Sequence, residues 1–369
     1  MGIDTMAGLS LITWWPLRAI LLAAVVVVVG LLVWRGRRWW SRATLVLLLL
    51  VLLPANVLTG INAHYGYYLT LGQAAGLPDP DTASTASLNR HTEPDNGVVV
   101  TIDIPGKDSR FTARRAEVYL PPAWFARARP HLPVLVLLHG TPGGPTDWVG
   151  VGMAQLTLDT WAHRHHGIAP IVVMPDINGS LNGDTECVNS PRGRVETYLS
   201  VDVPNFVRTR FFTQPPGKHW AVAGLSEGGS CALMLALRHP SVFTTFGDYS
   251  GLAGPRSGQT NDPAGTVAQL FAGSRRAFLE HEPSWLLAHH RYPQLAGWLE
   301  VGSDDTNAEA AARTLAPLAR HAGITTRLVT IPGDGHTFAL WRAALADSLP
   351  WIDEHISGDT ALASADHPR

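Results

Sequence analysis

The sequence predicts an α/β domain built on a mostly parallel central sheet, preceded by an N-terminal hairpin of two transmembrane helices. Three observations lead to this fold class. Two long apolar segments lie near the N-terminus, short apolar strands alternate with helices after residue 97, and a Gly-rich turn joins one strand to a helix. Strands that alternate with helices imply parallel pairing and a sheet covered on its faces. A chain of 369 residues has room for one large α/β domain and such an appendage.

Composition narrows the classes of function. Charged residues make up 16% of the chain, hydrophobic residues make up 46%, and the net charge is −2. We expect no nucleic-acid partner, because phosphate binding needs a basic excess. The two Cys exclude a disulfide-dense scaffold and a Cys-rich metal site. The run His163-Arg-His165-His166 lacks zinc-site spacing, so we expect no metal and no cofactor.

Two segments, at about residues 11–34 and 43–63, are apolar enough to span a membrane, which takes about 20 residues. The first contains Arg18, whose long stem can reach the interface, and Trp residues flank it as an aromatic belt would. A cleavable signal peptide is the alternative for the first segment, but an Arg-rich stretch follows in place of a small-residue cleavage site. A buried core hairpin of a soluble fold is disfavoured, because neither segment has a polar face. We therefore expect residues 1–75 to be a membrane anchor.

The link between these segments sets the orientation. Residues 35–42 read RGRRWWSR and contain four Arg, whereas the outer flanks contain almost none. The positive-inside rule places this link in the cytoplasm and everything after Ala63 outside it. Residues 76–96 are rich in Pro, Asp, Ser and Thr and predict a flexible linker. Residues 97–357 form the expected α/β domain, and residues 358–369 the expected disordered tail.

Short apolar runs and amphipathic stretches give the expected elements of that domain. The expected strands are Val98–Ile104, Glu117–Leu120, Val134–Leu138, Ile171–Met174, Trp220–Ala223, Trp298–Val301 and Arg327–Ile331. The expected helices are Val203–Phe211, Gly229–Arg238, Ala308–His321 and Ala339–His355. Continuous apolar runs such as Val134–Leu138 are typical of strands buried on both faces.

The segment Gly224-Leu-Ser226-Glu-Gly228 follows a strand and begins a helix. This G-x-S-x-G pattern is typical of a nucleophile elbow, in which the tight turn strains the Ser and leaves no room for side chains at the Gly positions. It predicts Ser226 as nucleophile and the N–H of Glu227, at the helix N-terminus, as one oxyanion donor. The alternative is a Gly-rich turn at a helix start, since the pentapeptide also occurs by chance.

A second oxyanion donor is expected after an earlier strand. Val134–Leu138 ends in His139-Gly140-Thr141-Pro-Gly-Gly, a Gly-rich loop of the expected form. This loop predicts the N–H of Thr141 as the donor. We interpret His139 as shaping the loop through a structural hydrogen bond.

The base and the acid follow in the chain order of α/β-hydrolases, Ser, then Asp or Glu, then His. His336 lies in a loop after a late strand and before the final helix, where it can take the Ser proton. Asp305 follows the strand Trp298–Val301 with G-x-x-D spacing and is the expected acid. Its neighbour Asp304 stays open as an alternative, and Asp334 is a weaker third candidate.

The two cysteines lie near the predicted elbow. Cys187 is in a polar loop, and Cys231 is five residues after Ser226 in the helix behind the nucleophile. An outward-facing domain permits a disulfide, so we predict a Cys187–Cys231 bond that pins this loop to the helix. Two free buried thiols are the alternative.

From about Gly97 to Ile356 the chain resembles the putative-esterase family of α/β-hydrolases, which includes antigen 85 mycolyltransferases, S-formylglutathione hydrolases and enterochelin-type esterases. The resemblance rests on Leu-His139-Gly140, Glu196-Thr-Tyr-Leu-Ser-Val-Asp-Val-Pro204, Gly224-Leu-Ser226-Glu-Gly-Gly229, Gly302-Ser-Asp-Asp305, and Gly335-His336-Thr-Phe with Trp341. It implies an α/β-hydrolase fold and serine-hydrolase activity. The expected acid is Asp in this chain, whereas it is Glu in antigen 85 proteins. In this respect the chain is closer to the esterase branch of the family. The anchor resembles that of membrane-anchored actinobacterial esterase-like proteins.

The expected function is that of an extracytoplasmic serine esterase of the cell membrane. Its expected partners are the lipid bilayer and a lipid or cell-envelope ester, because an anchor keeps the site near such substrates at high effective concentration. Aromatic residues within Asn261–Arg291 suit a cap over an acyl chain, or alternatively ordinary helix packing. Two other functions stay open: an acyltransferase of the mycolyltransferase type using the same triad, and a non-catalytic membrane scaffold.

Overall fold

The computed structural model describes residue 11 and residues 15–34, 39–65, 82–83, 88–89, 92–258 and 260–357. The chain divides into an N-terminal unit, within residues 1–80, and a globular unit that begins at residue 81.

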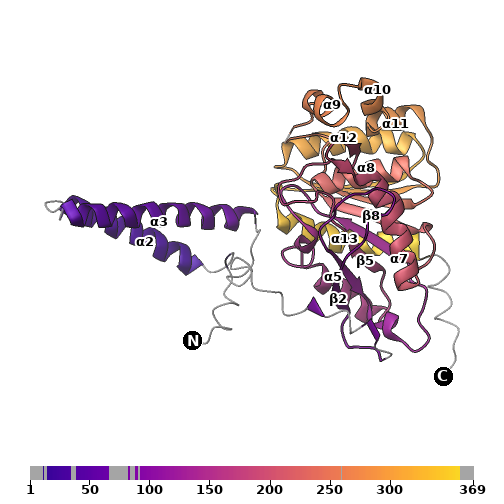
Figure 1. Ribbon diagram of the computed structural model, residues 1–369, viewed down its shortest axis with the longest axis horizontal. Helices are drawn as coiled ribbons and strands as arrows, with labels where there is room; N and C mark the ends of the chain where they lie inside the picture. The colour runs from indigo at the N-terminus through magenta and orange to yellow at the C-terminus, as the bar shows by residue number, and fades with distance from the viewer. Residues whose placement is uncertain are drawn as a thin grey trace. The chain divides into compact units, whose positions relative to one another are not determined.

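The N-terminal unit contains two long helices, α2 (Trp15–Trp34) and α3 (Trp39–Tyr65), which pack against each other (Figure 1). Both are long and apolar enough to cross a membrane. Their large apolar side chains point outward, among them Ile20, Val26, Leu47 and Leu50. Exposed apolar surface of this extent suits lipid better than water. Residues 12–14 of the expected first span and residues 35–38 of the Arg-rich link lie outside the described part of the chain.

Within the described residues, the globular unit is built on a nine-stranded sheet with the order β1-β2-β3-β5-β4-β8-β9-β10-β11. The strands are β1 (Thr82–Ala83), β2 (Val98–Ile102), β3 (Ala116–Leu120), β4 (Val134–Leu138), β5 (Ile171–Met174), β8 (Gly217–Leu225), β9 (Phe243–Tyr249), β10 (Ala296–Gly302) and β11 (Thr325–Ile331). Only β3 is antiparallel to its neighbours in this sheet, and the strands from β5 to β11 are all parallel. The predicted mostly parallel sheet is therefore confirmed.

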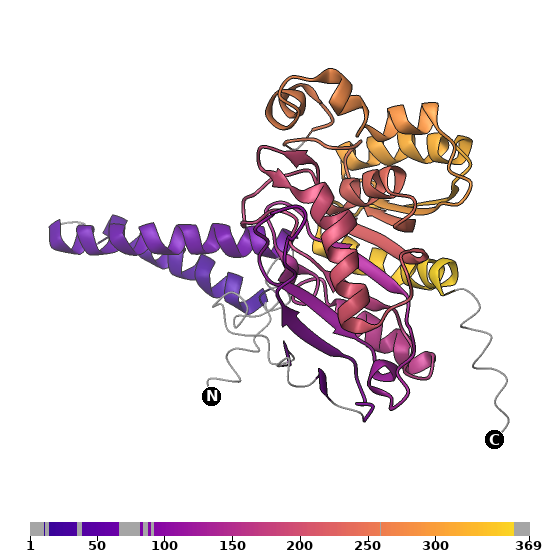
Figure 2. The same ribbon diagram turned by 45° about the vertical axis from the view of Figure 1, so that its right-hand side comes forward.

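Helices cover both faces of this sheet. They are α5 (Ala154–Arg164), α6 (Val195–Thr197), α7 (Val203–Phe211), α8 (Glu227–Arg238), α9 (Ala264–Leu270), α10 (Arg275–Leu279), α11 (Pro283–His289), α12 (Thr306–His321) and α13 (Phe338–Ile356). Helices α7, α8 and α12 lie on one side, and α5 and α13 lie on the other (Figures 1 and 2). Strand β4 shows why its run is wholly apolar: Val134, Val136 and Leu138 join the core beneath α7, α8 and α12. Leu135 and Leu137 point to the opposite face and are equally buried.

Part of the expected linker belongs to the sheet and the core. Within residues 76–96, strand β1 pairs with β2, and Leu88 is buried in the main hydrophobic cluster. The Leu88 carbonyl accepts a hydrogen bond from Arg129 Nη2 at 2.9 Å. Residues 76–81, 84–87 and 90–91 of the linker and the expected tail 358–369 lie outside the described residues.

Candidate active site

The Gly-x-Ser-x-Gly segment forms a sharp turn between β8 and α8. Ser226 sits at the turn with φ 54° and ψ −121°, a conformation that is strained for a residue with a side chain. A Cβ atom on Gly228 would lie 2.4 Å from the carbonyl oxygen of Leu138, which is too close for any other residue. The local sequence thus permits β4, β8 and α8 to approach closely and to expose the Ser226 hydroxyl at the carboxyl edge of the sheet.

Replacing Gly228 by Ala is expected to destabilise the domain by about 3 kcal/mol, because the new Cβ would clash with the backbone carbonyl oxygens of Leu138 and His139, which cannot move aside. The melting temperature should fall by roughly 6–12 °C, measured by calorimetry on the purified chain in detergent. Gly265→Ala in α9 is the matched control, since its Cβ would meet only Gln269 Nε2 at 3.7 Å. A Gly228→Ala variant that melts with the wild type would contradict the close approach.

Three predicted residues from three separate loops meet at this turn. His336 Nε2 lies 2.9 Å from Ser226 Oγ, and His336 Nδ1 lies 2.5 Å from Asp305 Oδ2. The Asp305 side chain is 10% exposed and the His336 side chain 33% exposed, so a substrate can reach the imidazole while the carboxylate stays covered. The ring of Trp341 packs edge-on against His336 with centroids 4.9 Å apart, which fixes the imidazole plane.

The two alternative acids lie elsewhere. Asp304 is exposed, and its Oδ1 is 3.2 Å from the hydroxyl of its neighbour Ser303. Asp334 takes part in the turn through its backbone, where its carbonyl accepts the Asp304 N–H at 2.9 Å. Of the three candidates, Asp305 is the one whose carboxylate contacts His336.

The loop after β4 lies directly against Ser226. A Cβ atom on Gly140 would be 3.0 Å from Ser226 Cβ, which leaves the next residue, Thr141, beside the reaction centre. The loop is tied down by hydrogen bonds from Trp148 Nε1 to the Leu138 carbonyl and from Gly143 N–H to the Leu181 carbonyl. The expected donors, the N–H groups of Thr141 and Glu227, therefore come from the two segments that flank Ser226.

His139 is a structural residue of that loop. Its Nδ1 is 2.8 Å from the Gly140 carbonyl, and its Nε2 is 3.1 Å from the Ile177 nitrogen and 3.2 Å from Asp176 Oδ1. Burial alone would raise the pKa of Asp176, but the contact with His139 and hydrogen bonds from Arg114 and from the Asn178 N–H outweigh it and hold that pKa well below its ordinary value. His139 thus joins the loops after β4 and β5.

The Cys187–Cys231 disulfide is present, with the two Cα atoms 5.7 Å apart. It fastens the loop after β5 to α8, the helix that begins directly after Ser226. Glu186 and Cys187 both adopt left-handed backbone conformations, with φ of 51° and 53°. The covalent bond holds this strained segment beside the elbow.

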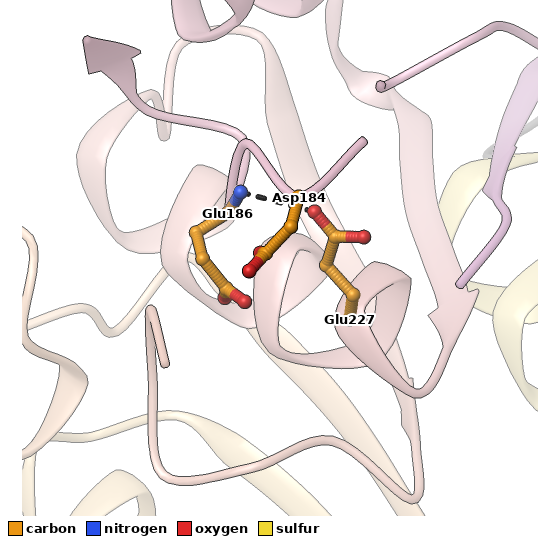
Figure 3. Close-up of side chains that lie close together, drawn as sticks. All are labelled: Asp184, Glu186 and Glu227. Atoms are coloured by element: carbon orange, nitrogen blue, oxygen red, sulfur yellow. Dashed lines mark hydrogen bonds between the residues drawn. The ribbon is translucent and has the colours of Figure 1, made fainter. Parts of the chain in front are cut away.

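Sequence reasoning missed a group of acidic side chains next to Ser226. Carboxyl oxygens of Asp184, Glu186 and Glu227 lie within 4.8 Å of one another, where the loop after β5 meets the first turn of α8 (Figure 3). Burial raises the pKa of Glu227 and of Glu186, and the neighbouring carboxylates raise the pKa of Glu186 further.

This spacing resembles that of a cation site, but protein donors already serve both carboxyl oxygens of Glu227 and the carboxyl group of Glu186. Glu227 accepts hydrogen bonds from Asn178 Nδ2 at 2.7 Å and from the Glu186 N–H at 3.0 Å, and Glu186 accepts one from the Arg256 N–H. We therefore interpret the group as acids that share protons. Asn178 could have been found from the sequence, because it follows a buried strand at the carboxyl edge of the sheet.

A polar cavity of about 550 Å³ opens beside this acidic group. Its lining residues share polar or very small side chains, and they are Asn178, Ser180, Asn182, Gly183, Asp184, Thr185, Arg192, Ser257, Gly258 and Gln269. Asn178 belongs both to the cavity wall and to the contacts of Glu227.

The aromatic residues of the segment 261–291 pack inward. Phe271 and Phe278 are buried in the main core with ring centroids 5.6 Å apart, and Trp285 stacks on His289 at 4.3 Å. The structure therefore shows ordinary helix packing here, and these side chains contribute to holding α9–α11 on the domain.

A nucleophile elbow followed along the chain by an acid and a histidine defines a serine hydrolase of the α/β-hydrolase fold. The chain matches the model of the family described as "Putative esterase" over residues 112–352, and it belongs to that family.

Similar proteins agree with this assignment. An uncharacterized protein of Corynebacterium glutamicum is 36% identical over 318 residues, which cover 82% of this chain and 74% of that protein. The MPT51 antigen of Mycobacterium leprae is 30% identical over 152 residues, 41% of this chain and 47% of the antigen.

Solved structures show the same fold. A ferulic acid esterase superposes with a TM-score of 0.59 at 23% identity and covers 70% of this chain and 98% of its own. An S-formylglutathione hydrolase from Agrobacterium tumefaciens superposes with a TM-score of 0.58 at 18% identity, covering 71% of this chain and 97% of its own. The α/β-hydrolase fold predicted from the sequence is confirmed.

Proposed function

We propose that this chain is a membrane-anchored serine esterase whose catalytic domain lies outside the cytoplasm. One observation carries the proposal: hydrogen bonds run without a break from Ser226 Oγ through the His336 ring to the Asp305 carboxylate. The strained elbow under Ser226 and membership of an esterase family support the same reading.

In the proposed reaction, Ser226 Oγ attacks the acyl carbon while His336 Nε2 takes the hydroxyl proton. The Asp305 carboxylate accepts the Nδ1–H hydrogen bond and stabilises the imidazolium that forms. His336 then returns the proton to the leaving alcohol, and the acyl group stays on Ser226. A water molecule, deprotonated by the same histidine, releases the acid in the second half-reaction.

The oxyanion of each tetrahedral intermediate is assigned to the N–H groups of Thr141 and Glu227. The Glu227 N–H lies in the first turn of α8, where the helix leaves backbone donors without intrahelical partners. Each such donor contributes about 10²–10³ to kcat in serine hydrolases.

The substrate class follows from the anchor. The outward-facing apolar side chains of α2 and α3 suit a bilayer, and the Arg-rich link favours a hairpin whose two ends face outward. The Cys187–Cys231 disulfide independently favours an oxidising, extracytoplasmic compartment. An active site tethered there meets membrane lipids and cell-envelope esters at high effective concentration, so we propose these as substrates.

The orientation predicts where a reporter fused to the chain is active. Alkaline phosphatase fused after Gly76 should be active, because the enzyme needs an oxidising compartment to form its disulfides. The same reporter fused after Arg38, inside the Arg-rich link, is the matched control and should be inactive. Activity of the second fusion and not of the first would overturn the proposed topology.

The activity itself is tested by hydrolysis of a graded series of p-nitrophenyl esters, from acetyl to palmitoyl, by the full chain in detergent micelles. The proposal expects turnover that rises with acyl length when micelles present the substrate. Absence of turnover with every ester, by protein that shows the disulfide and a cooperative melt, would contradict the esterase assignment.

A second candidate function is acyl transfer, in which a hydroxylated acceptor replaces water. The polar cavity beside Glu227 favours it, because its amide, hydroxyl, carboxylate and guanidinium groups could bind several hydroxyl groups of an acceptor. Product analysis with and without a trehalose-like disaccharide separates the two functions. An acylated disaccharide supports transfer, and free acid alone in both reactions supports hydrolysis.

A further inference from the structure

The hydroxyl group of Thr141 sits at the centre of a small polar network. Thr141 Oγ1 lies 2.9 Å from the Gly183 carbonyl, 2.6 Å from Asn178 Nδ2, and in very close contact with Glu227 Oε2. These partners come from the loop after β5 and from α8. The network therefore connects the loop after β4 to the nucleophile helix directly beside Ser226.

The donors and acceptors of this network determine whether the Glu227 side chain is protonated. Asn178 Oδ1 accepts the Thr185 N–H at 3.0 Å, which fixes the amide so that Nδ2 faces Thr141 and Glu227 as a donor. The Thr141 hydroxyl has a single proton and two oxygens within reach, the Gly183 carbonyl and Glu227 Oε2. Both contacts are hydrogen bonds when this proton goes to the Gly183 carbonyl, which can only accept. The contact between Thr141 Oγ1 and Glu227 Oε2 then needs a proton from Glu227, which acts as a neutral carboxylic acid.

We propose that Asn178 and the carboxyl group of Glu227 are positioning residues that hold the Thr141 hydroxyl and so keep the Thr141 N–H aimed at the oxyanion. Glu227 then serves both donors of the oxyanion hole, one through its own N–H and the other through its side chain. The inference rests on the proposed function, because it concerns the oxyanion donors of that same site.

The surroundings of Glu227 favour the neutral form that this role needs. Burial raises its pKa and outweighs the hydrogen bonds with Thr141 and Asn178 and the charge of His139, which lower it. Asp184 also raises it, since two carboxylates at this distance repel when both are charged. Other charged or titratable groups face the site from each packed segment. His139 and Asp176 lie at the ends of β4 and β5, and Asp184 and Glu186 lie in the loop after β5. Two arginines are already paired with acids, Arg192 with Asp184 and Arg256 with Glu282. Ionisation of Glu227 would remove the donor to Thr141 and add charge beside Asp184 and Glu186.

Thr141→Val tests the positioning role, because it removes the hydroxyl and keeps both the backbone N–H and the side-chain shape. We expect kcat to fall about 10- to 100-fold with KM unchanged, less than the 10²–10³ that follows loss of a whole oxyanion donor. The affinity for a trifluoromethyl ketone, which mimics the tetrahedral intermediate, should fall by the same factor as kcat. Thr141→Ser restores the hydroxyl and is expected to restore kcat.

Asn178→Ala provides a second variant through the same network. It should lower kcat with KM unchanged, and the double variant with Thr141→Val should be no worse than the more damaging single one, since the two residues act as a unit. Independent, multiplying effects of the two substitutions would overturn the proposal.

The pH profile supplies a readout that a purely structural role would not change. In the wild type, kcat should fall on the alkaline side as Glu227 ionises, and Glu227→Gln should lack that fall because an amide does not ionise. Glu300→Gln is the matched control: Glu300 is also a buried acid, with a pKa raised to about 7, but it contacts Trp298 away from the elbow. The control should keep the wild-type profile.

The results separate failure of this inference from failure of the proposed function. If the wild type hydrolyses esters and Thr141→Val matches it in kcat and in inhibitor affinity, the positioning role is wrong and the esterase stands. If the wild type hydrolyses no ester, the proposed function fails first. If the kcat of Glu227→Gln falls at alkaline pH as that of the wild type does, the proposal is also overturned.

Discussion

Replacing Ser226 by Ala is expected to lower kcat for ester hydrolysis by about 10⁶-fold, the size of loss seen when the nucleophile of a serine hydrolase is removed. Ser226 supplies the only oxygen that the structure places 2.9 Å from His336 Nε2, so no neighbouring hydroxyl among the described residues can take over the attack. The measurement is kcat for a p-nitrophenyl ester by stopped-flow and long-time assays on the purified full chain.

Ser230→Ala is the matched control for this substitution. Ser230 lies one helical turn further along α8, and its Oγ is 3.1 Å from the Glu227 carbonyl, within its own helix. The control should keep kcat within about threefold of the wild type, since the hydroxyl touches no reacting group. A Ser226→Ala variant with more than one tenth of wild-type activity would show that another residue is the nucleophile.

Asp305→Asn is expected to lower kcat by about 10⁴-fold while leaving the fold intact. The Asn side chain keeps the shape of the carboxylate but presents an amide to His336 Nδ1, and such a change holds the imidazole in the wrong tautomer. The lost charge also removes the stabilisation of the imidazolium. The measurement is kcat at saturating substrate, with the melting temperature recorded in parallel.

The neighbouring acid offers a close control for Asp305→Asn. Asp304 is exposed and makes its side-chain contact with Ser303, so Asp304→Asn should stay within about threefold of wild-type kcat. Equal losses of kcat in the two variants would show that each substitution acts by disturbing the loop, and not by removing the acid that contacts His336. A loss confined to Asp304→Asn would move the acid to that residue.

Local patterns in the sequence were enough to predict the features that short stretches of chain determine. The apolar run of β4 and the glycines around Ser226 each reflect a steric condition within a few residues. The long apolar helices α2 and α3 follow from composition alone. The sequence favoured Asp305 over Asp304 as the acid but could not decide between them. Adjacent side chains point in different directions, and the path of the loop determines which of the two carboxylates reaches His336.

Features that depend on contacts between remote segments escaped prediction. Strand β9 (Phe243–Tyr249) was missed because Gly247 and Asp248 interrupt its apolar run, although the strand is buried between β8 and β10. The pairing of β1 inside the expected linker likewise depends on a partner strand about 17 residues away.

The acidic group beside Ser226 was missed for the same reason. It brings together residues of the loop after β5 and the first turn of α8, and nothing in the spacing of Asp184, Glu186 and Glu227 along the chain indicates that meeting. The aromatic residues Phe271 and Phe278 were ambiguous between a ligand-binding cap and a packed core, since both choices use the same side chains.

The most direct test of the central claim is covalent labelling of the purified full chain with a fluorophosphonate probe, followed by mass spectrometry of the proteolytic peptides. The account predicts one adduct, on Ser226, that is absent from Ser226→Ala and present in Ser230→Ala. Failure of the wild type to react while a positive-control serine hydrolase is labelled, or an adduct that persists in Ser226→Ala, would contradict it.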